Sequence, residues 1–181
     1  SIVACNAMVS RACRRWQETS RARASSRLIR SGTSTSTSQR SVPRNYLFVA
    51  IDRTSKFAFV ELHERATARI ATAFLRALAE AVPYKIHTVL TDNGIQFADL
   101  PKNRSKPTAM WRGHPFDRAC GQLDIEHRLT KPNHPWTNGQ VERMNRTLKE
   151  ATVQRYHYDT HDQLRAHLID FVTAYNFARR L

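Results

Sequence analysis

Two short strings hold the side chains of this sequence that could do chemistry. The string Thr-Asp-Asn-Gly at 91–94 follows the apolar run 86–90, which predicts that Asp92 lies where a strand ends and the chain turns. The string Asn-Gly-Gln-Val-Glu-Arg at 138–143 is expected to open a helix with Glu142 in its first turn. A fold that brings these two carboxylates together would offer hard oxygen ligands, which suit Mg²⁺ or Mn²⁺ and the chemistry of phosphoryl transfer.

Each carboxylate also has a simpler explanation. Asp-Asn-Gly is a common turn sequence, and a Glu in the first turn of a helix is stabilised by the helix dipole. A third carboxylate, Asp52, directly follows the apolar run 46–51 and precedes the stretch Arg-Thr-Ser-Lys at 53–56. We favour a turn-capping role for Asp52, because Asp readily accepts hydrogen bonds from the backbone of its own turn.

The two strings together resemble the core of DDE transposases of the retroviral-integrase type, the rve family, and especially its bacterial insertion-sequence branch. The resemblance rests on Asp-Asn-Gly at 92–94 and on the long string 131–146, and it extends from about Tyr46 to Leu181. It implies that Asp92 and Glu142 are the second and third catalytic, metal-binding carboxylates of an active site that takes two Mg²⁺ or Mn²⁺ ions. It also implies self-association and DNA as the partner, both as transposon ends and as target.

Cationic side chains beside Glu142 are candidate phosphate contacts. Arg146 and Lys149 follow Glu142 by four and seven residues, so all three lie on one helix face, where DNA phosphates would arrive. The alternative is a solvated face with a weak Glu142–Arg146 ion pair. Lys131 is a further candidate for a phosphate contact, although a single Lys usually faces water.

Hydrophobic periodicity predicts the elements that must position these residues. Strands are expected at 46–51, 57–62, 86–90 and 125–129, and helices at 66–82, 115–123, 138–155 and 161–178. This order predicts an α/β fold, and by resemblance an RNase H-like integrase core with a mixed sheet flanked by helices. The run 86–90 is expected to be buried on both faces of the sheet.

One strand of that fold is expected to be degraded or missing. In the family the first catalytic Asp lies on a strand before the hairpin, but here no Asp precedes Asp52 and residues 32–41 are rich in Ser and Thr. Read one base earlier, Thr codons become Tyr, His, Asn or Asp codons, and Ser codons become Phe, Leu, Ile or Val codons. Residues 30–41 can then decode to Pro-Ile-Gly-Tyr-Phe-His-Ile-Asp-Ile-Ala-Glu-Val, which alternates like a half-buried strand and carries an Asp.

The sequence therefore divides into two parts. Residues 1–44 are predicted to be a disordered, basic Ser/Arg-rich segment that is translated out of frame, and 45–181 an integrase-type core, truncated at both ends relative to the family. The formal charge is +14, of which residues 1–44 contribute +8 and the remaining residues +6. Such a basic balance favours a polyanionic partner.

Composition also bears on membrane association and on the cellular compartment. No run of about eighteen apolar residues is present, so no membrane partner is expected. Three scattered cysteines predict no disulfide framework and favour a reducing cytoplasm, here the bacterial cytoplasm with its nucleoid. Cys120 is interpreted as a packed thiol.

Two functions stay open at this point. The first is DNA integration or transposition, with metal-dependent phosphodiester cleavage and strand transfer in the intact form of the protein. The second is an inactive transposase remnant that at most binds DNA or a full-length transposase. Because the first Asp is absent, we expect this chain itself to be inactive.

Overall fold

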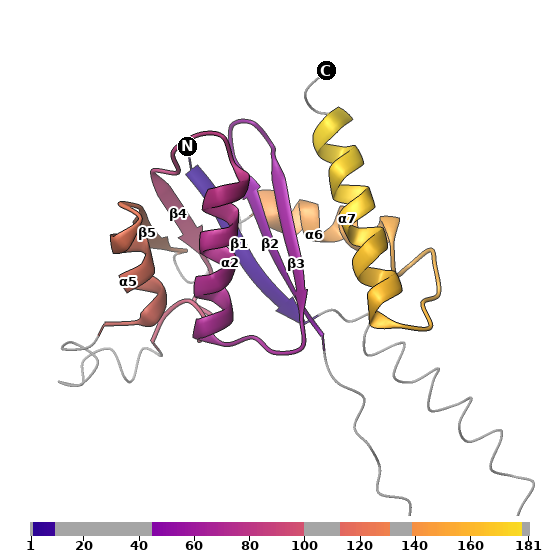
Figure 1. Cartoon of the computed structure of the whole chain (residues 1–181), viewed down its shortest axis with the longest axis horizontal. Coiled ribbons are helices and arrows are strands. Elements are labelled where there is room, and N and C mark those ends of the chain that lie inside the picture. Colours follow the sequence, from indigo (N-terminus) through magenta and orange to yellow (C-terminus); the bar gives the residue numbers. More distant parts are fainter. Residues whose placement is uncertain (1, 10–44, 100–112, 131–138, 179–181) are drawn as a thin grey trace, which may run out of the picture.

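The computed structural model describes residues 2–9, 45–99, 113–130 and 139–178, and these residues contain a five-stranded sheet in the order β3-β2-β1-β4-β5 (Figure 1). The strands are β1 Ile2–Val9, β2 Tyr46–Asp52, β3 Ala58–His63, β4 Thr88–Thr91 and β5 Glu126–Leu129. β2 pairs antiparallel with both β1 and β3, whereas β1 pairs with β4, and β4 with β5, in parallel. The sheet is therefore mixed, as predicted.

Helices cover both faces of this sheet. They are α2 Ala68–Ala81, α5 Pro115–Gln122, α6 Gly139–Ala151 and α7 His161–Ala178. On one face α2 and α5 pack on the sheet through a cluster that includes Phe48, Phe74 and Phe116. On the other face α6 and α7 form a second cluster with β2 and β3. The predicted α/β class is confirmed, with helices on both faces of the sheet (Figure 1) and one hydrophobic cluster on each face.

The central position of the sheet corrects the expectation of a missing first strand. Ile2–Val9 fill it, pairing with β2 on one side and with β4 on the other. Val3 and Cys5 pack into the cluster on the α2 face and Ala4 into the cluster on the α6 face, and all three are at most 2 % exposed. Ile2–Val9 therefore form a strand of the sheet, with Val3, Ala4 and Cys5 in the core, while the rest of the predicted disordered segment, residues 1 and 10–44, lies outside the described residues.

The other predicted elements occur where the periodicity placed them, with small shifts at their ends. All four residues of β4 are buried, as expected for a strand covered on both faces. α2 begins after Thr67, whose side chain accepts a hydrogen bond from the Ile70 N–H, and it ends just before Pro83. α6 ends at Ala151 rather than at 155, and the residues that follow form turns.

The turn between β2 and β3 is built around Asp52. Its carboxylate accepts hydrogen bonds from the backbone N–H groups of Thr54 and Ser55, from the Ser55 hydroxyl and from the Tyr84 hydroxyl, at 2.6–3.2 Å. Asp52 is only 3 % exposed, so these donors replace the water that a carboxylate needs. The structure thus agrees with the turn-capping role that the sequence favoured.

At the outer edge of the sheet, α7 is attached to β3 by a side-chain amide. Asn176 accepts a hydrogen bond from the Ala58 N–H and donates one to the Ala58 carbonyl, both at 2.8 Å. These bonds satisfy backbone groups of an edge strand that would otherwise need water. They fix the C-terminal part of α7 beside the β2–β3 turn, where Figure 1 also shows it.

Candidate active site

Asp92 lies directly after β4, next to the central strand. The neighbouring Thr91 is fully buried, and the Asp92 carboxylate accepts a hydrogen bond from the Gly94 N–H at 3.0 Å, which closes a tight turn. A Cβ at position 94 would lie 2.3 Å from the end of the Gln96 side chain, so a larger residue there would require that side chain to move. The predicted placement at a strand end is therefore correct.

The surroundings of Asp92 make its negative charge costly. Burial raises the pKa of the Asp92 carboxyl above its ordinary value, and the Gly94 N–H opposes that rise only in part. The charge of Asp92 also contributes to raising the pKa of the Cys5 thiol, an effect that comes mainly from burial of the thiol. A carboxylate that is held in this way, with one oxygen left without a donor among the described residues, favours a cation as its partner.

Glu142 lies in the first turn of α6, as predicted. Val141, Met144 and Leu148 anchor this helix in the core, so the intervening Glu142 and Arg146 are exposed. Among the described residues neither Glu142 nor Arg146 forms an ion pair, so the Glu142–Arg146 pair considered above is absent from this part of the structure. Both charged groups are therefore open to solvent and to a ligand.

The helix and the strand that carry the two carboxylates are joined through β1. α6 packs against β1 and β2 by contacts that involve Ala4 and Val49, and β1 pairs directly with β4, which Asp92 follows. The two residues thus belong to elements that both contact β1. A shared metal site for Asp92 and Glu142 remains a prediction.

No third carboxylate joins them among the described residues. Those residues contain no group of three or more His, Cys, Asp or Glu side chains that could hold a metal ion. Asp52 is committed to its turn, and β1 contributes no acidic residue. In the parallel register Cys5 of β1 pairs with Thr91 of β4, so the residues that follow them are Asn6 and Asp92. The sequence has an asparagine, and not an aspartate, at this position of β1.

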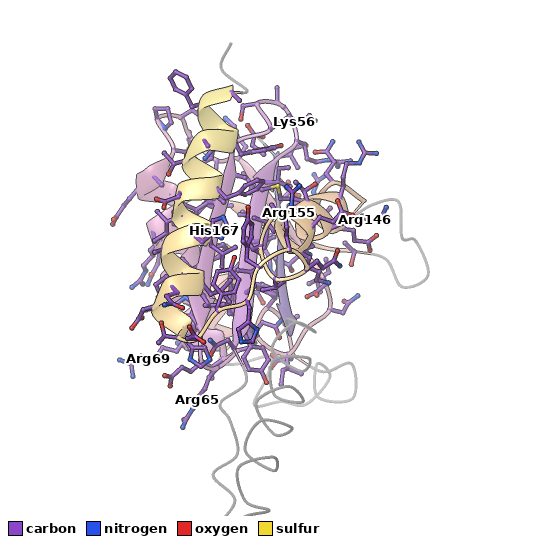
Figure 2. All side chains as sticks on the ribbon, turned by 90° about the vertical axis from the view of Figure 1, so that its right-hand side faces the viewer. Lys56, Arg65, Arg69, Arg146, Arg155 and His167 are labelled. Atoms are coloured by element: carbon purple, nitrogen blue, oxygen red, sulfur yellow. The ribbon has the colours of Figure 1, made fainter. Side chains whose placement is uncertain are left out.

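Two of the three cations that the sequence offered as phosphate contacts are described by the structure, and they differ in their exposure. Arg146 is exposed on α6 (Figure 2), while Lys149 is half-buried and lines an apolar cavity with Leu62, Leu168 and other residues of β2, β3, α6 and α7. The stem of Lys149 therefore packs against apolar groups while its ammonium group is long enough to reach water. Lys131 lies outside the described residues.

A hydrogen-bonded chain beside Asp92 was not foreseen from the sequence. His127 of β5 bonds the Asp117 carboxylate through Nδ1 and the Thr91 hydroxyl through Nε2, the latter at 2.7 Å. It links α5, β5 and the end of β4, and so holds the strand that positions Asp92. The residues are ten to thirty-six positions apart, so no local pattern could have indicated it. Cys120 is buried nearby and burial raises its pKa to about 12, which agrees with a packed thiol.

Comparison with known proteins identifies the family. A protein family described as "Integrase core domain" matches residues 33–135. A second family with the same description matches residues 123–180. The first match alone covers more than half of the chain. The chain belongs to the integrase core domain family. The first match begins inside the Ser/Thr-rich run, ahead of β2, in residues whose structure is not described.

A solved structure shows the same fold as this integrase core. A chain of the simian T-cell lymphotropic virus intasome in complex with PP2A regulatory subunit B56 gamma is similar at 22 % identity and a TM-score of 0.52, over 69 % of this chain and 41 % of that one. The catalytic core domain of BIV integrase is similar at 20 % identity and a TM-score of 0.49, over 69 % and 70 % of the two chains. The predicted RNase H-like class is confirmed, and the chain spans less than half of the intasome protein that it matches.

The described helices of the integrase core include none with the length and apolar character that crossing a membrane requires.

Asp92→Asn is expected to change how the stability of this integrase core depends on pH. Because the pKa of Asp92 is raised in the folded state, the folded protein gains from its protonated form below the ordinary value of 3.8 and loses that gain as pH rises through the folded-state pKa. The neutral Asn variant should lack this loss and be at least as stable as the parent at pH 7. Denaturant unfolding between pH 3 and pH 8 measures the difference.

The same pair of proteins tests whether Asp92 takes a cation. Mg²⁺ or Mn²⁺ should raise the midpoint of thermal unfolding of the parent and leave that of Asp92→Asn unchanged, since a ligand stabilises the state that binds it. An equal response of both proteins to the ions would contradict the assignment of Asp92 as a metal ligand.

Proposed function

We propose that this chain derives from the catalytic core of a DNA transposase, which in its intact form cleaves phosphodiesters and joins transposon ends to target DNA. The observation that carries the proposal is the placement of two carboxylates in an integrase core: Asp92 at the end of β4 and Glu142 in the first turn of α6. Family membership supports DNA integration as the general process. The details of the reaction are our proposal.

The donor set fits a divalent cation in part. Asp92 and Glu142 would hold it through carboxylate oxygens, with water completing its coordination. When bound, such an ion lowers the pKa of an attacking water or hydroxyl and stabilises charge on the reacting phosphate. The protein's own part is to fix Asp92 through the 91–94 turn and the His127 contact, and to present Glu142 on a rigid helix.

The missing third carboxylate favours the second candidate function for the chain as it stands. Two carboxylates alone give a weaker, less charged site than three carboxylates would. We therefore propose that the 181-residue chain binds DNA without carrying out strand transfer. Apolar side chains on α7, Ile169 at 54 % and Phe177 at 69 % exposure, offer a surface for association with a second copy or with an intact transposase.

DNA binding is expected to depend on the cations beside Glu142. Replacing Arg146 and Lys149 together with Gln should weaken binding of duplex DNA by about tenfold for each lost phosphate contact near 0.1 M salt. The slope of log Kd against log salt should also fall by about 0.9 for each contact. Fluorescence anisotropy of a labelled duplex over a range of NaCl concentrations measures both quantities.

The matched control removes two exposed cations elsewhere. Arg65 and Arg69 lie at the end of the molecule away from Arg146 (Figure 2), and their replacement with Gln changes the net charge by the same amount. If this control weakens binding as much as the Arg146/Lys149 variant does, the DNA responds only to net charge and the assigned contacts are wrong. If the parent binds no DNA, the proposed function itself fails.

A further inference from the structure

A groove on the other flank of α6 has the chemistry of a phosphate site. It lies between α6, the β2–β3 turn and α7, and the side chains that line it include Lys56, Gln140, Arg143 and Thr147. These α6 residues recur every three to four positions, so they form a face of their own. Glu142, Arg146 and Lys149 are not part of this lining.

The charge of the groove has one sign. Ile51, Met144 and Tyr175 complete its lining, so it contains two cations and no carboxylate. Arg143 is exposed and forms no ion pair with any described residue. Lys56 is half-buried and donates one hydrogen bond to the Arg53 carbonyl, which leaves an ammonium group with two further donors. Two cations without acidic partners in a concave surface favour an anion.

Lys56 is held in place by the turn that Asp52 organises. Its backbone is in the left-handed region, with φ of 61°, and its N–H donates to the Asp52 carbonyl at 3.1 Å. Figure 2 shows Lys56 at the end of the sheet beside α7. The cation is thus fixed to a rigid hairpin, which lowers the entropy that a ligand contact would cost.

Gln140 adds an unpaired acceptor. Its Oε1 is buried and accepts no hydrogen bond from any described residue, which is costly for a polar atom in the first turn of a helix. A ligand that brought an N–H donor, such as a nucleobase, or an ordered water would satisfy it. A nucleic acid offers both an anionic backbone and N–H donors.

We propose that this groove is a second phosphate-binding site for DNA, with Arg143 and Lys56 contacting the backbone and Gln140 accepting from a base or a bridging water. The inference rests on the proposed function, since it assumes that the ligand is DNA. Arg143 follows Glu142 directly on α6. A DNA strand that contacts Glu142 can therefore continue along this helix and reach Arg143 in the groove. This places a DNA contact on a face of α6 other than the one that carries Glu142, Arg146 and Lys149.

The test combines two kinds of variant that should fail in different ways. Lys56→Gln with Arg143→Gln should weaken binding of a labelled duplex by about tenfold for each lost contact near 0.1 M salt and lower the salt slope by about one to two. Gln140→Leu removes a neutral group, so it should weaken binding two- to tenfold at about the same slope, as expected for a neutral hydrogen bond. Arg143→Lys keeps the charge and should retain the slope.

The outcomes separate the groove from the proposed function. The control is again Arg65→Gln with Arg69→Gln, and thermal unfolding of every variant shows which of them keep the parent's fold. If Lys56→Gln/Arg143→Gln binds with the slope of that control while Arg146→Gln/Lys149→Gln binds more weakly, the groove is wrong and the proposed function stands. If Gln140→Leu binds as tightly as the parent, the amide has no ligand. A parent that binds no DNA overturns both.

Discussion

Replacing Val3 with Asp is expected to abolish cooperative unfolding of this integrase core. Val3 is 1 % exposed, pairs with Asp52 on one side and with Val89 on the other, and packs in the cluster below α2. A carboxylate at this position would be buried without a cation, which costs more than about 4 kcal/mol. Small domains have a total stability of only about 5–15 kcal/mol, so the loss is a large share of it. Chemical denaturation followed by circular dichroism measures it.

The control for this prediction lies one residue earlier in the same strand. Ile2 is 40 % exposed, so Ile2→Asp should change the free energy of unfolding by no more than about 1 kcal/mol. If Val3→Asp and Ile2→Asp unfold alike, then Ile2–Val9 do not form the central strand. The first integrase core match begins at residue 33, so the run 33–41 would then be the segment to examine for that role.

Restoring a carboxylate-bearing first strand is expected to have the largest effect on activity. A protein whose residues 30–41 are replaced by the frame-shifted sequence should bind Mg²⁺ or Mn²⁺ and carry out strand transfer, provided that the new strand displaces Ile2–Val9 from the centre of the sheet. The 181-residue chain should be at least about 10³-fold slower. The physical reason is charge, since Ser and Thr hydroxyls cannot replace a carboxylate as a metal ligand. Calorimetry with the ions and a strand-transfer assay on labelled DNA measure the two effects.

Three controls make this result decisive. Glu142→Gln in the restored protein should abolish the activity, and Asn6→Asp in the original chain tests whether β1 can supply the ligand from its own position. The nucleotide sequence is an independent check, because a single-base insertion or deletion between about Gln39 and Tyr46 must restore the strand. Strand transfer by the original chain that Glu142→Gln abolishes would contradict the prediction and make Asp52 the third ligand.

The local elements of the fold were predictable because their signals are local. The helices at 68–81 and 161–178 follow from apolar residues at helical spacing, and β4 follows from a short buried run. The turn-capping role of Asp52 was predictable for the same reason, since the donors at Thr54 and Ser55 lie two and three residues away. Asp92 and Glu142 were selected from sequence motifs. They lie where those motifs predicted, directly after β4 and in the first turn of α6.

The central strand was not predictable from the sequence. Residues 1–44 read as a basic tail because their average composition is polar and Arg-rich, although Ile2–Val9 alone are mostly apolar. Whether such a segment is a tail or a strand depends on partners that lie far away in the chain: Cys5 pairs with Ala50 and with Thr91. The cost of closing those loops is met only by the complete sheet, so the decision belongs to the tertiary structure.

The sequence by itself determined the chemistry that this chain can offer: two carboxylates in integrase-like strings, a row of cations after Glu142, and no Asp before Asp52. Only the tertiary structure decided what surrounds these groups. It buries Asp92 enough to raise its pKa, joins His127 to Thr91 across β4 and β5, and brings Lys56 and Arg143 into the lining of one groove. Residue type and spacing are local properties of a chain, whereas desolvation and the meeting of distant side chains arise only when the sheet and its helices pack together.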